Sequence, residues 1–288
     1  MENNLKKILA CVDGSSYSDS VADHSAWLGR SLGVAVELLH VLPDVRQKTA
    51  LADLSGAIGV DASSELLNQL TEEDEARAKD ELREGRKIIA RAEERLCKAG
   101  VSEIVSLKRR GTLVDTICEL ESDIEIIVLG KLGKYSDEHV TRAVSNAEQV
   151  ARAVQRPLMI TSRDFKAPKR FLIAFDGGRS SNKALEYVIG SPLLKEVECH
   201  IVSVGSDGDG STKSLDLAAA KLGAAGFDMH SSLLSGQPDM AIQAYVDSNN
   251  IDLLVIGAYG HSRIRSLILG STTTSIITSC KIPLLLFR

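Results

Sequence analysis

Residues 252–260 have the sequence Asp-Leu-Leu-Val-Ile-Gly-Ala-Tyr-Gly, and after nine further residues the chain continues with Gly270-Ser271-Thr272. The apolar run that follows Asp252 predicts a buried β-strand, and the segment from Thr272 to Ser279 predicts the start of a helix. Glycines after a strand let backbone N–H groups approach an anion closely, and a helix N-terminus adds unpaired donors and a positive dipole. The stretch therefore predicts a site for a nucleotide or another phosphorylated small molecule.

The sequence also contains an internal repeat. Matching pairs of segments are 8–14 with 172–178, 111–117 with 236–242, and 157–160 with 283–286. Each half predicts the order β-α-β-α-β-α-β-α-β, and its Ile, Val and Leu runs are typical of parallel strands that helices cover on both faces. We expect an α/β fold with two tandem doubly wound domains, each built on a five-stranded parallel sheet. The domains would span residues 1–162 and 169–288, joined by a linker at 161–169.

The first half is longer than the second by about 36 residues, which lie within an insertion at about 44–98. Part of it, from Pro43 to about Asp61, predicts a loop. The rest, from about Glu72 to Lys98, predicts a charged helix with an apolar stripe every seven residues, at Leu82, Ile89 and Leu96. Two interpretations are open: an extended surface helix that packs on the sheet, which we favour, or a lid or partner-docking element.

Composition limits the class of protein. Of the 288 residues, 44% are hydrophobic, which is typical of a globular protein, and the net charge of −5 with only 4% aromatic residues argues against binding to nucleic acid. The five cysteines form no C-x-x-C pair, so neither a disulfide framework nor a zinc site is expected. No stretch has the apolar length of a membrane span or of a signal peptide. A cytoplasmic protein is therefore expected.

The spacing G-x2-G-x9-G-(S/T), which begins at Gly257, resembles the signature of the ATP-binding universal stress proteins. The segments 7–15 and 170–177 each look like that family's first strand, which ends in an aspartate that contacts adenine. The resemblance covers nearly the whole chain twice, apart from the insertion. The sequence is identified as that of a tandem universal stress protein.

This resemblance implies a nucleotide site in the second half. Asp176 would accept a hydrogen bond from the adenine amino group, and Ala174 and Phe175 would lie beside the base. Val204 would offer backbone groups to the base. By itself, the Asp-Gly-Gly sequence that starts at Asp176 is equally typical of a turn between a strand and a helix.

The phosphates would lie at the other part of the motif. Backbone N–H, hydroxyl and cationic groups for the ribose and the phosphates would come from Gly257, Gly260, His261, Arg263, Arg265, Gly270, Ser271 and Thr272. The ligand would be ATP, or else ADP or AMP, and magnesium or manganese would accompany a triphosphate. No dedicated metal ligands and no catalytic residues are expected. His40, His200 and His230 are expected to be isolated core or surface residues.

The first half departs from the family pattern. Asp13, Val41, Gly130 and Gly133 match the motif, but Val144 stands where the family has a glycine. A valine side chain there would block the approach of a phosphate to the backbone. The first half is therefore expected to have lost its phosphate site. Lys131, Lys134 and Arg142 could still hold an anion, although a structural role is favoured.

Several functions remain open from the sequence. The leading one is an ATP-binding regulator of the stress response, whose nucleotide state an unknown protein partner would detect. A second is a slow ATPase or an autophosphorylating protein, because Ser271 and Thr272 to Thr274 place several hydroxyls near the phosphates. A third is a scaffold without nucleotide. An adenylating ATP pyrophosphatase is disfavoured because neither aspartate turn matches its S-G-G-x-D-S loop.

The last strand of each half, at 157–160 and 283–287, is apolar and would form an exposed edge unless it is covered. We expect these two strands to pair within one chain, as the subunits of a family dimer do. A homodimer of the whole chain remains open.

Overall fold

The computed structural model describes residues 6–42, 60–133, 145–206, 210–258 and 270–288, with side chains in the helix after residue 59 described at residue 76 and from residue 78 onward. Its strands are β1 (Lys7–Cys11), β2 (Val36–Leu42), β3 (Ile104–Arg110), β4 (Ile124–Gly130), β5 (Leu158–Thr161), β6 (Arg170–Ala174), β7 (Glu198–Val204), β8 (Met229–Leu234), β9 (Leu253–Gly257) and β10 (Leu284–Phe287). Its helices are α1 (Ser18–Leu32), α3 (Val60–Lys98), α4 (Leu113–Leu120), α5 (Asn146–Ala153), α6 (Arg179–Gly190), α7 (Ser211–Ala224), α8 (Pro238–Ser248) and α9 (Ser271–Ser279), with short 3₁₀ helices at Glu121–Asp123 and Pro192–Leu194.

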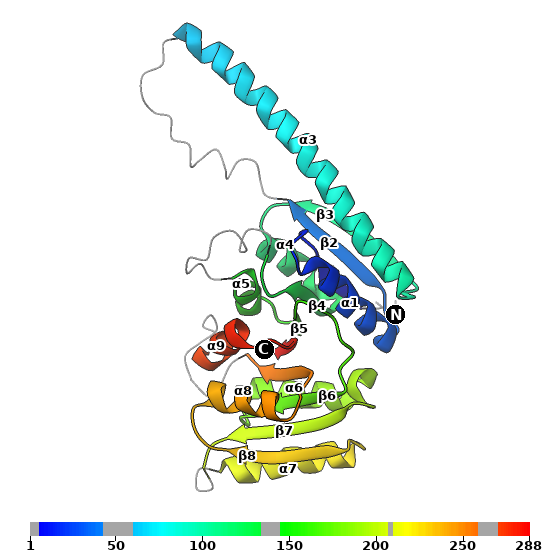
Figure 1. Cartoon of the computed structure of the whole chain (residues 1–288), viewed down its shortest axis with the longest axis vertical. Helices are drawn as coiled ribbons and strands as arrows, with labels where there is room; N and C mark the ends of the chain where they lie inside the picture. Colours follow the sequence, from blue (N-terminus) through cyan, green and yellow to red (C-terminus); the bar gives the residue numbers. More distant parts are fainter. Residues whose placement is uncertain (1–5, 43–59, 134–144, 207–209, 259–269) are drawn as a thin grey trace.

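The described strands form one continuous sheet in the order β3-β2-β1-β4-β5-β10-β9-β6-β7-β8 (Figure 1). Within each half every pair of neighbours is parallel, as the expected doubly wound fold requires. The first half contributes β1 to β5 and the second contributes β6 to β10. Counted outward from the central pair β5–β10, the strands of the two halves follow the same order. The α/β fold predicted from the repeat is therefore confirmed.

The two halves join through β5 and β10, which run antiparallel. Met159 is paired with Leu285, and the neighbouring pairs are Leu284 with Ile160 and Leu286 with Leu158. Each strand therefore covers the other's edge, so that neither apolar strand is left open to pair with another chain. The predicted pairing of the last strands within one chain is confirmed by this register.

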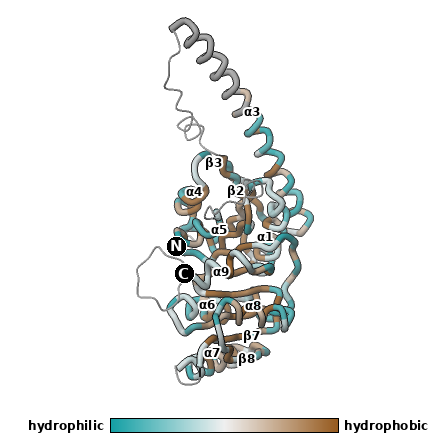
Figure 2. The backbone as a smooth tube through the Cα atoms, turned by 60° about the vertical axis from the view of Figure 1, so that its left-hand side comes forward, coloured by the Kyte–Doolittle hydropathy of each residue, from teal (hydrophilic) through white to brown (hydrophobic). Residues whose placement is uncertain are grey.

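Helices cover both faces of the sheet, and each face has one apolar core that runs through both halves. One core combines α1, α3, α6 and α7 with strand residues such as Met159 and Leu285. The other combines α4, α5, α8 and α9 with residues such as Ile160 and Leu284. Figure 2 shows the apolar residues concentrated in the strands and hydrophilic residues along the coloured part of α3. Alternate residues of β5 and β10 therefore enter opposite cores.

The helix of the insertion is longer than expected. It begins at Val60, whereas the sequence predicted a loop to about Asp61 and a helix only from about Glu72. It is also the crossover between the parallel strands β2 and β3, a connection that parallel pairing requires. The counterpart in the second half is α7, with 14 residues against 39 in α3. The insertion therefore lengthens an obligatory helix.

The C-terminal part of α3 packs on the domain, as Figure 1 shows. Ile89 and Leu96 are buried in the core, whereas Leu82, the first member of the predicted stripe, is exposed. Arg91 forms an ion pair with Asp19 of α1, and Arg95 Nη2 donates to Asp23 Oδ2 at 2.6 Å. For this part of the helix, the favoured interpretation of a surface helix packed on the domain is confirmed.

The segment between β5 and β6 packs against α1. Phe165 lies edge-on against His24, with ring centroids 4.8 Å apart, and also contacts Trp27. His24 is 1% exposed, and its Nδ1 lies 2.8 Å from the carbonyl oxygen of Ser20. Burial lowers the pKa of His24 to about 4, against the smaller opposing effects of the Ser20 carbonyl and Asp23. This histidine is therefore neutral in the folded protein at neutral pH.

Among the described residues, no helix combines the length and the apolar character that crossing a membrane would take.

Replacing Leu285 with glutamate places a charge in the fully buried centre of the β5–β10 seam. We expect Leu285→Glu to lower the free energy of unfolding by about 4 kcal/mol or more, because the carboxylate has no partner there. Leu217→Glu is the matched control, since Leu217 is 60% exposed and should change stability by less than about 0.5 kcal/mol. Equal melting temperatures for the two variants would contradict the described seam.

His24 should make the protein sensitive to mild acid. The unfolded chain takes up a proton near pH 6.5 and the folded chain only near pH 4, so stability is lost as pH falls through 6.5. The loss due to His24 should be about 2 kcal/mol between pH 7 and pH 5. Urea unfolding at both pH values should show a smaller acid loss in His24→Leu than in the wild type. An equal acid loss in His24→Leu and in the wild type would contradict the described burial of His24.

Candidate functional site

In the second half, the order in which the chain adds strands to the sheet changes direction between β6 and β9. From β6 the chain moves outward to β7 and β8, and then returns to β9 on the other side of β6. A crevice forms at the carboxyl ends of strands at such a point, and open α/β sheets bind ligands there. Asp176 follows β6 and Gly257 ends β9, so the fold places both at this crevice.

Asp176 organises the turn into α6. Its Oδ1 accepts hydrogen bonds from the backbone N–H of Gly178 at 2.8 Å and from the hydroxyl of Ser181 at 2.6 Å. Gly177 adopts φ +74°, a left-handed conformation that favours glycine. Asp176 itself is exposed. The turn role that the Asp-Gly-Gly sequence suggested is thus present, together with a carboxylate that faces solvent.

The other residues expected near the base differ in exposure. Ala174 and Phe175 are buried, and the backbone N–H of Phe175 already donates to the carbonyl oxygen of Val202. Val204 is half-buried at the end of β7. The side chain of Phe175 belongs to the core. It could therefore support an adenine base only from beneath, through the packing of the core.

The N-terminus of α9 has the features of an open anion site. Gly270 is its N-cap residue, and it provides no side-chain hydrogen bond to the first turn, which also lacks an acidic residue. A Cβ built on Gly270 would meet only Thr273 Oγ1, at 3.8 Å. Ser271 and Thr272 are the first two residues of α9, so their hydroxyls belong to the same first turn. Ser271 is exposed and Thr272 is half-buried. Among the described residues no side chain caps the N–H groups of this turn, and the turn has no carboxylate of its own to offset the dipole.

Close packing against α6 is by itself enough to require glycine at position 257. A Cβ at this position would lie 2.7 Å from the backbone nitrogen of Ser181 and 2.9 Å from Cβ of Ser180, both in the first turn of α6. Gly130 has the same position at the end of β4, where a Cβ would lie 2.6 Å from Cβ of Tyr17. These glycines let a helix N-terminus pack closely on a strand end. The presence of Gly257 alone is therefore not a sign of a ligand.

The equivalent positions of the first half are closed. The N-terminus of α5 is capped by Ser145, whose hydroxyl accepts from the backbone N–H of Glu148, and Glu148 places an acid in the first turn. A Cβ on Gly133 would lie 3.0 Å from Asp13 Oδ2 and 3.2 Å from Asn146 Nδ2, so the chain itself is packed against the aspartate. The helix dipole of α5 is already offset by a carboxylate.

Helix α3 also covers part of this end of the first half. A Cβ on Gly14, which follows Asp13, would lie 2.8 Å from Cδ1 of Ile88 in α3. Lys131 has a structural role, as its Nζ donates to the carbonyl oxygen of Cys280 in the second half at 2.6 Å. Burial lowers the pKa of Lys131. The structural role favoured for this lysine is confirmed.

Other expected site residues lie outside the described residues. They are Gly260, His261, Arg263 and Arg265 of the second half, and Lys134, Arg142 and Val144 of the first. Their proposed contacts with a nucleotide remain predictions.

The five cysteines are free. Cys11, Cys199 and Cys280 are buried, and Cys97 and Cys118 are exposed. Burial raises the pKa of Cys199 to about 12 and raises that of Cys11 as well, where Asp13 adds to the effect. These two thiols stay protonated near neutral pH, in agreement with the expected inert role of Cys11.

A comparison with protein families supports the interpretation of the motifs. The universal stress protein family matches residues 4–162 and 209–288 of this chain. The chain belongs to the universal stress protein family. The matched segments omit 163–208, where Asp176 and Val204 lie, but similarity to individual family members covers that region as well.

One such relative is the universal stress protein Slr1230 of Synechocystis sp. It is 36% identical over 291 residues, which cover 99% of this chain and 100% of the relative. Among solved structures, a universal stress protein from Archaeoglobus fulgidus matches 100% of this chain and 99% of its own, with a TM-score of 0.72 and 22% identity. A putative universal stress protein from Pseudomonas aeruginosa covers 98% and 93%, with a TM-score of 0.62 and 12% identity. These structures share the whole-chain fold.

The sequence prediction that His200 and His230 are isolated is wrong. The two residues are direct neighbours across β7 and β8, and with Glu198 they form a compact cluster. The signal available in the sequence was the Glu-x-His alternation of β7, which puts Glu198 and His200 on one face of the sheet. The register of β8, which brings His230 to the same place, was not visible in the sequence.

The close packing at Gly257 can be tested by adding one methyl group. Gly257→Ala should lower the free energy of unfolding by about 1–3 kcal/mol, because the new carbon collides with backbone atoms of α6 that cannot rotate away. Gly223→Ala in α7 is the control. A Cβ there meets nothing within 4 Å, so alanine should raise stability by up to about 1 kcal/mol. Chemical denaturation measures both, and a neutral Gly257→Ala would contradict the described contact.

Proposed function

We propose that this chain is a nucleotide-binding regulatory protein of the stress response. It binds one adenine nucleotide, ATP in the first instance, at the C-terminal end of the second half's strands. The nucleotide orders the loops around that end, and a protein partner distinguishes the bound form from the free one. Family membership and the whole-chain likeness to other universal stress proteins support the general class.

The contrast between α5 and α9 carries the proposal of a single site. These two helices occupy equivalent positions, each before the last strand of its half. The first turn of α5 has a serine cap and a glutamate, whereas the first turn of α9 has neither. A phosphate would be repelled by the carboxylate at α5 and attracted by the uncapped N–H groups at α9. The nucleotide therefore has a phosphate site in the second half only.

The adenine end of the ligand would lie toward Asp176. Its exposed carboxylate can accept a hydrogen bond from an exocyclic amino group, while the Oδ1 contacts with Gly178 and Ser181 hold it in place. Val204 supplies strand-end backbone for the base, and Ser271 and Thr272 supply hydroxyls for the phosphates. Magnesium or manganese would accompany a triphosphate through the phosphate oxygens. The cytoplasm, where ATP is abundant, is the proposed location.

A single acidic substitution tests the phosphate site without harming the fold. Ser271→Asp adds a carboxylate to the first turn of α9, where it should stabilise the helix by about 0.3–1 kcal/mol through the dipole. The same carboxylate should repel the phosphates, and we expect at least a tenfold loss of ATP affinity. Isothermal titration of nucleotide-stripped protein measures the affinity and the number of sites, which should be close to one per chain.

The first half provides a matched control. Ser145→Asp places the same charge at the equivalent helix, where aspartate also caps well, and should leave ATP binding unchanged. Loss of binding in Ser145→Asp instead would place the site in the first half. Two sites per chain would contradict the single-site proposal, and absence of any nucleotide binding in the wild type would favour a scaffold.

A further inference from the structure

At the opposite end of the second half's strands lies a cavity of about 700 Å³ that the nucleotide proposal does not use. Arg170 and Glu198 line it from the beginnings of β6 and β7, and Asn249 lines it from the end of α8. Strand β7 has seven residues, and its six steps from Glu198 to Val204 place the cavity about 20 Å from the carboxyl ends of the strands. This cavity is therefore separate from the proposed nucleotide site.

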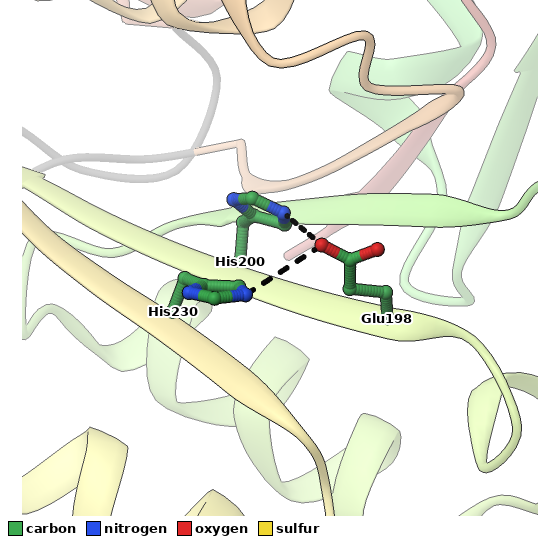
Figure 3. A group of neighbouring side chains, drawn as sticks. All are labelled: Glu198, His200 and His230. Carbon is green, nitrogen blue, oxygen red and sulfur yellow. Dashed lines mark hydrogen bonds and ion pairs between the residues drawn. The ribbon is translucent and has the colours of Figure 1, made fainter.

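Three potential metal ligands meet in the cavity. His200 Nε2 lies 3.1 Å from Glu198 Oε1, and His230 Nε2 lies 3.6 Å from the same oxygen. Figure 3 shows both imidazole rings directed at this one carboxylate oxygen. One ligand atom from each residue lies within 4.8 Å of the others. Around a tetrahedral zinc ion, bonds of 2.0–2.2 Å put ligand atoms about 3.4 Å apart, so small side-chain movements would complete the site.

The surroundings hold the ligands in this arrangement. His200 is buried, and its second nitrogen, Nδ1, lies 2.9 Å from the hydroxyl of Tyr245 in α8. A hydrogen bond to the second nitrogen fixes the orientation and the tautomer of a ligating histidine. Arg170 Nε donates to Glu198 Oε2 at 2.9 Å, which leaves Oε1 to the two imidazoles. Arg170 also helps to lower the pKa of Glu198, as does the contact with His200.

The set of donors favours a particular class of ion. Two imidazole nitrogens and one carboxylate oxygen suit zinc and neighbouring transition metals, whereas magnesium prefers oxygen ligands. The side chain of His230 is 59% exposed, so an ion can reach the cluster from solvent. Three protein ligands leave one position of a tetrahedral ion for water or an anion from the cavity. The positive charge of Arg170 weakens cation binding but would favour an anion in that open position.

From this geometry we infer that Glu198, His200 and His230 form a binding site for a divalent transition metal, zinc or a similar ion, with Tyr245 as a positioning residue. The cross-strand register of β7 and β8 brings the two histidines together, and the alternation within β7 adds the glutamate. The three residues form a His₂Glu set on the face of the sheet that α8 covers.

The test uses the full chain, freed of any affinity tag and with its thiols blocked, because Cys97 and Cys118 are exposed. Cobalt(II) is the optical probe, since it replaces zinc and its visible absorption reports a tetrahedral or five-coordinate site. One equivalent should bind, zinc should displace it, and excess magnesium should not. Absence of a saturable cobalt spectrum together with absence of zinc binding by calorimetry would overturn the proposal.

Variants locate the site. His230→Ala and Glu198→Gln should each weaken zinc affinity more than tenfold, and both should keep the wild-type ATP affinity. Leu217→Ala, a change at an exposed residue of α7, should bind zinc as the wild type does. Tyr245→Phe should weaken zinc binding about tenfold, as expected for the loss of a partner of a ligating histidine. Wild-type zinc affinity in both His230→Ala and Glu198→Gln would overturn the proposal, and wild-type affinity in Tyr245→Phe would overturn the positioning role.

Discussion

The antiparallel pairing of β5 with β10 is the contact on which the rest of the structure depends. Without it, each half would end in a four-residue apolar strand with unpaired backbone groups along one edge. With it, two parallel sheets become a single sheet, and the helices on each face bury one core across both halves. Backbone hydrogen bonding and apolar burial thus act at the same seam. The carboxyl ends of the strands in the two halves are held in a fixed relation because all the strands belong to one sheet.

Helices α5 and α9 occupy equivalent positions in the two halves of this sheet, but their N-termini differ. The same turn geometry occurs in both halves: Asp13 Oδ1 accepts from the backbone N–H of Ser15, and Asp176 Oδ1 accepts from that of Gly178. The difference lies farther along the chain, where the N-cap residue of α5 provides a side-chain cap and the N-cap residue of α9, a glycine, does not. A helix that is capped by its own side chain gains stability, and an open helix N-terminus retains the capacity to bind an anion.

Much of the fold could be predicted from the sequence because its signals are local. Apolar runs such as residues 253–256 identify buried strands, and the repeat gives their order twice. The first part of α3, residues 60–71, was missed because its serine, asparagine and threonine residues also suit a loop. The glycine at residue 59 marks the start of the helix better than composition does. The role of Gly257 could not be separated from ligand binding, since a close approach to a helix and a close approach to a phosphate both call for glycine.

The candidate sites also show how far prediction from local sequence signals can go. Asp176 and Gly270 could be proposed as candidates from the sequence because a family motif orders them along the chain. The cluster of Glu198, His200 and His230 could not, because it depends on the register between two strands whose residues are 30 positions apart. Register is set by the packing of both faces of the sheet, and no short motif records it.

Covalent linkage of the two halves has a consequence for how such a protein can change. In a symmetric dimer of separate chains, every substitution appears on both sides of the two-fold axis, so one site cannot be altered without altering its copy. Here β5 and β10 belong to one chain, and a substitution enters the sheet only once. Each half can therefore change on its own, as the longer crossover helix of the N-terminal half shows, with the seam between the halves unaffected.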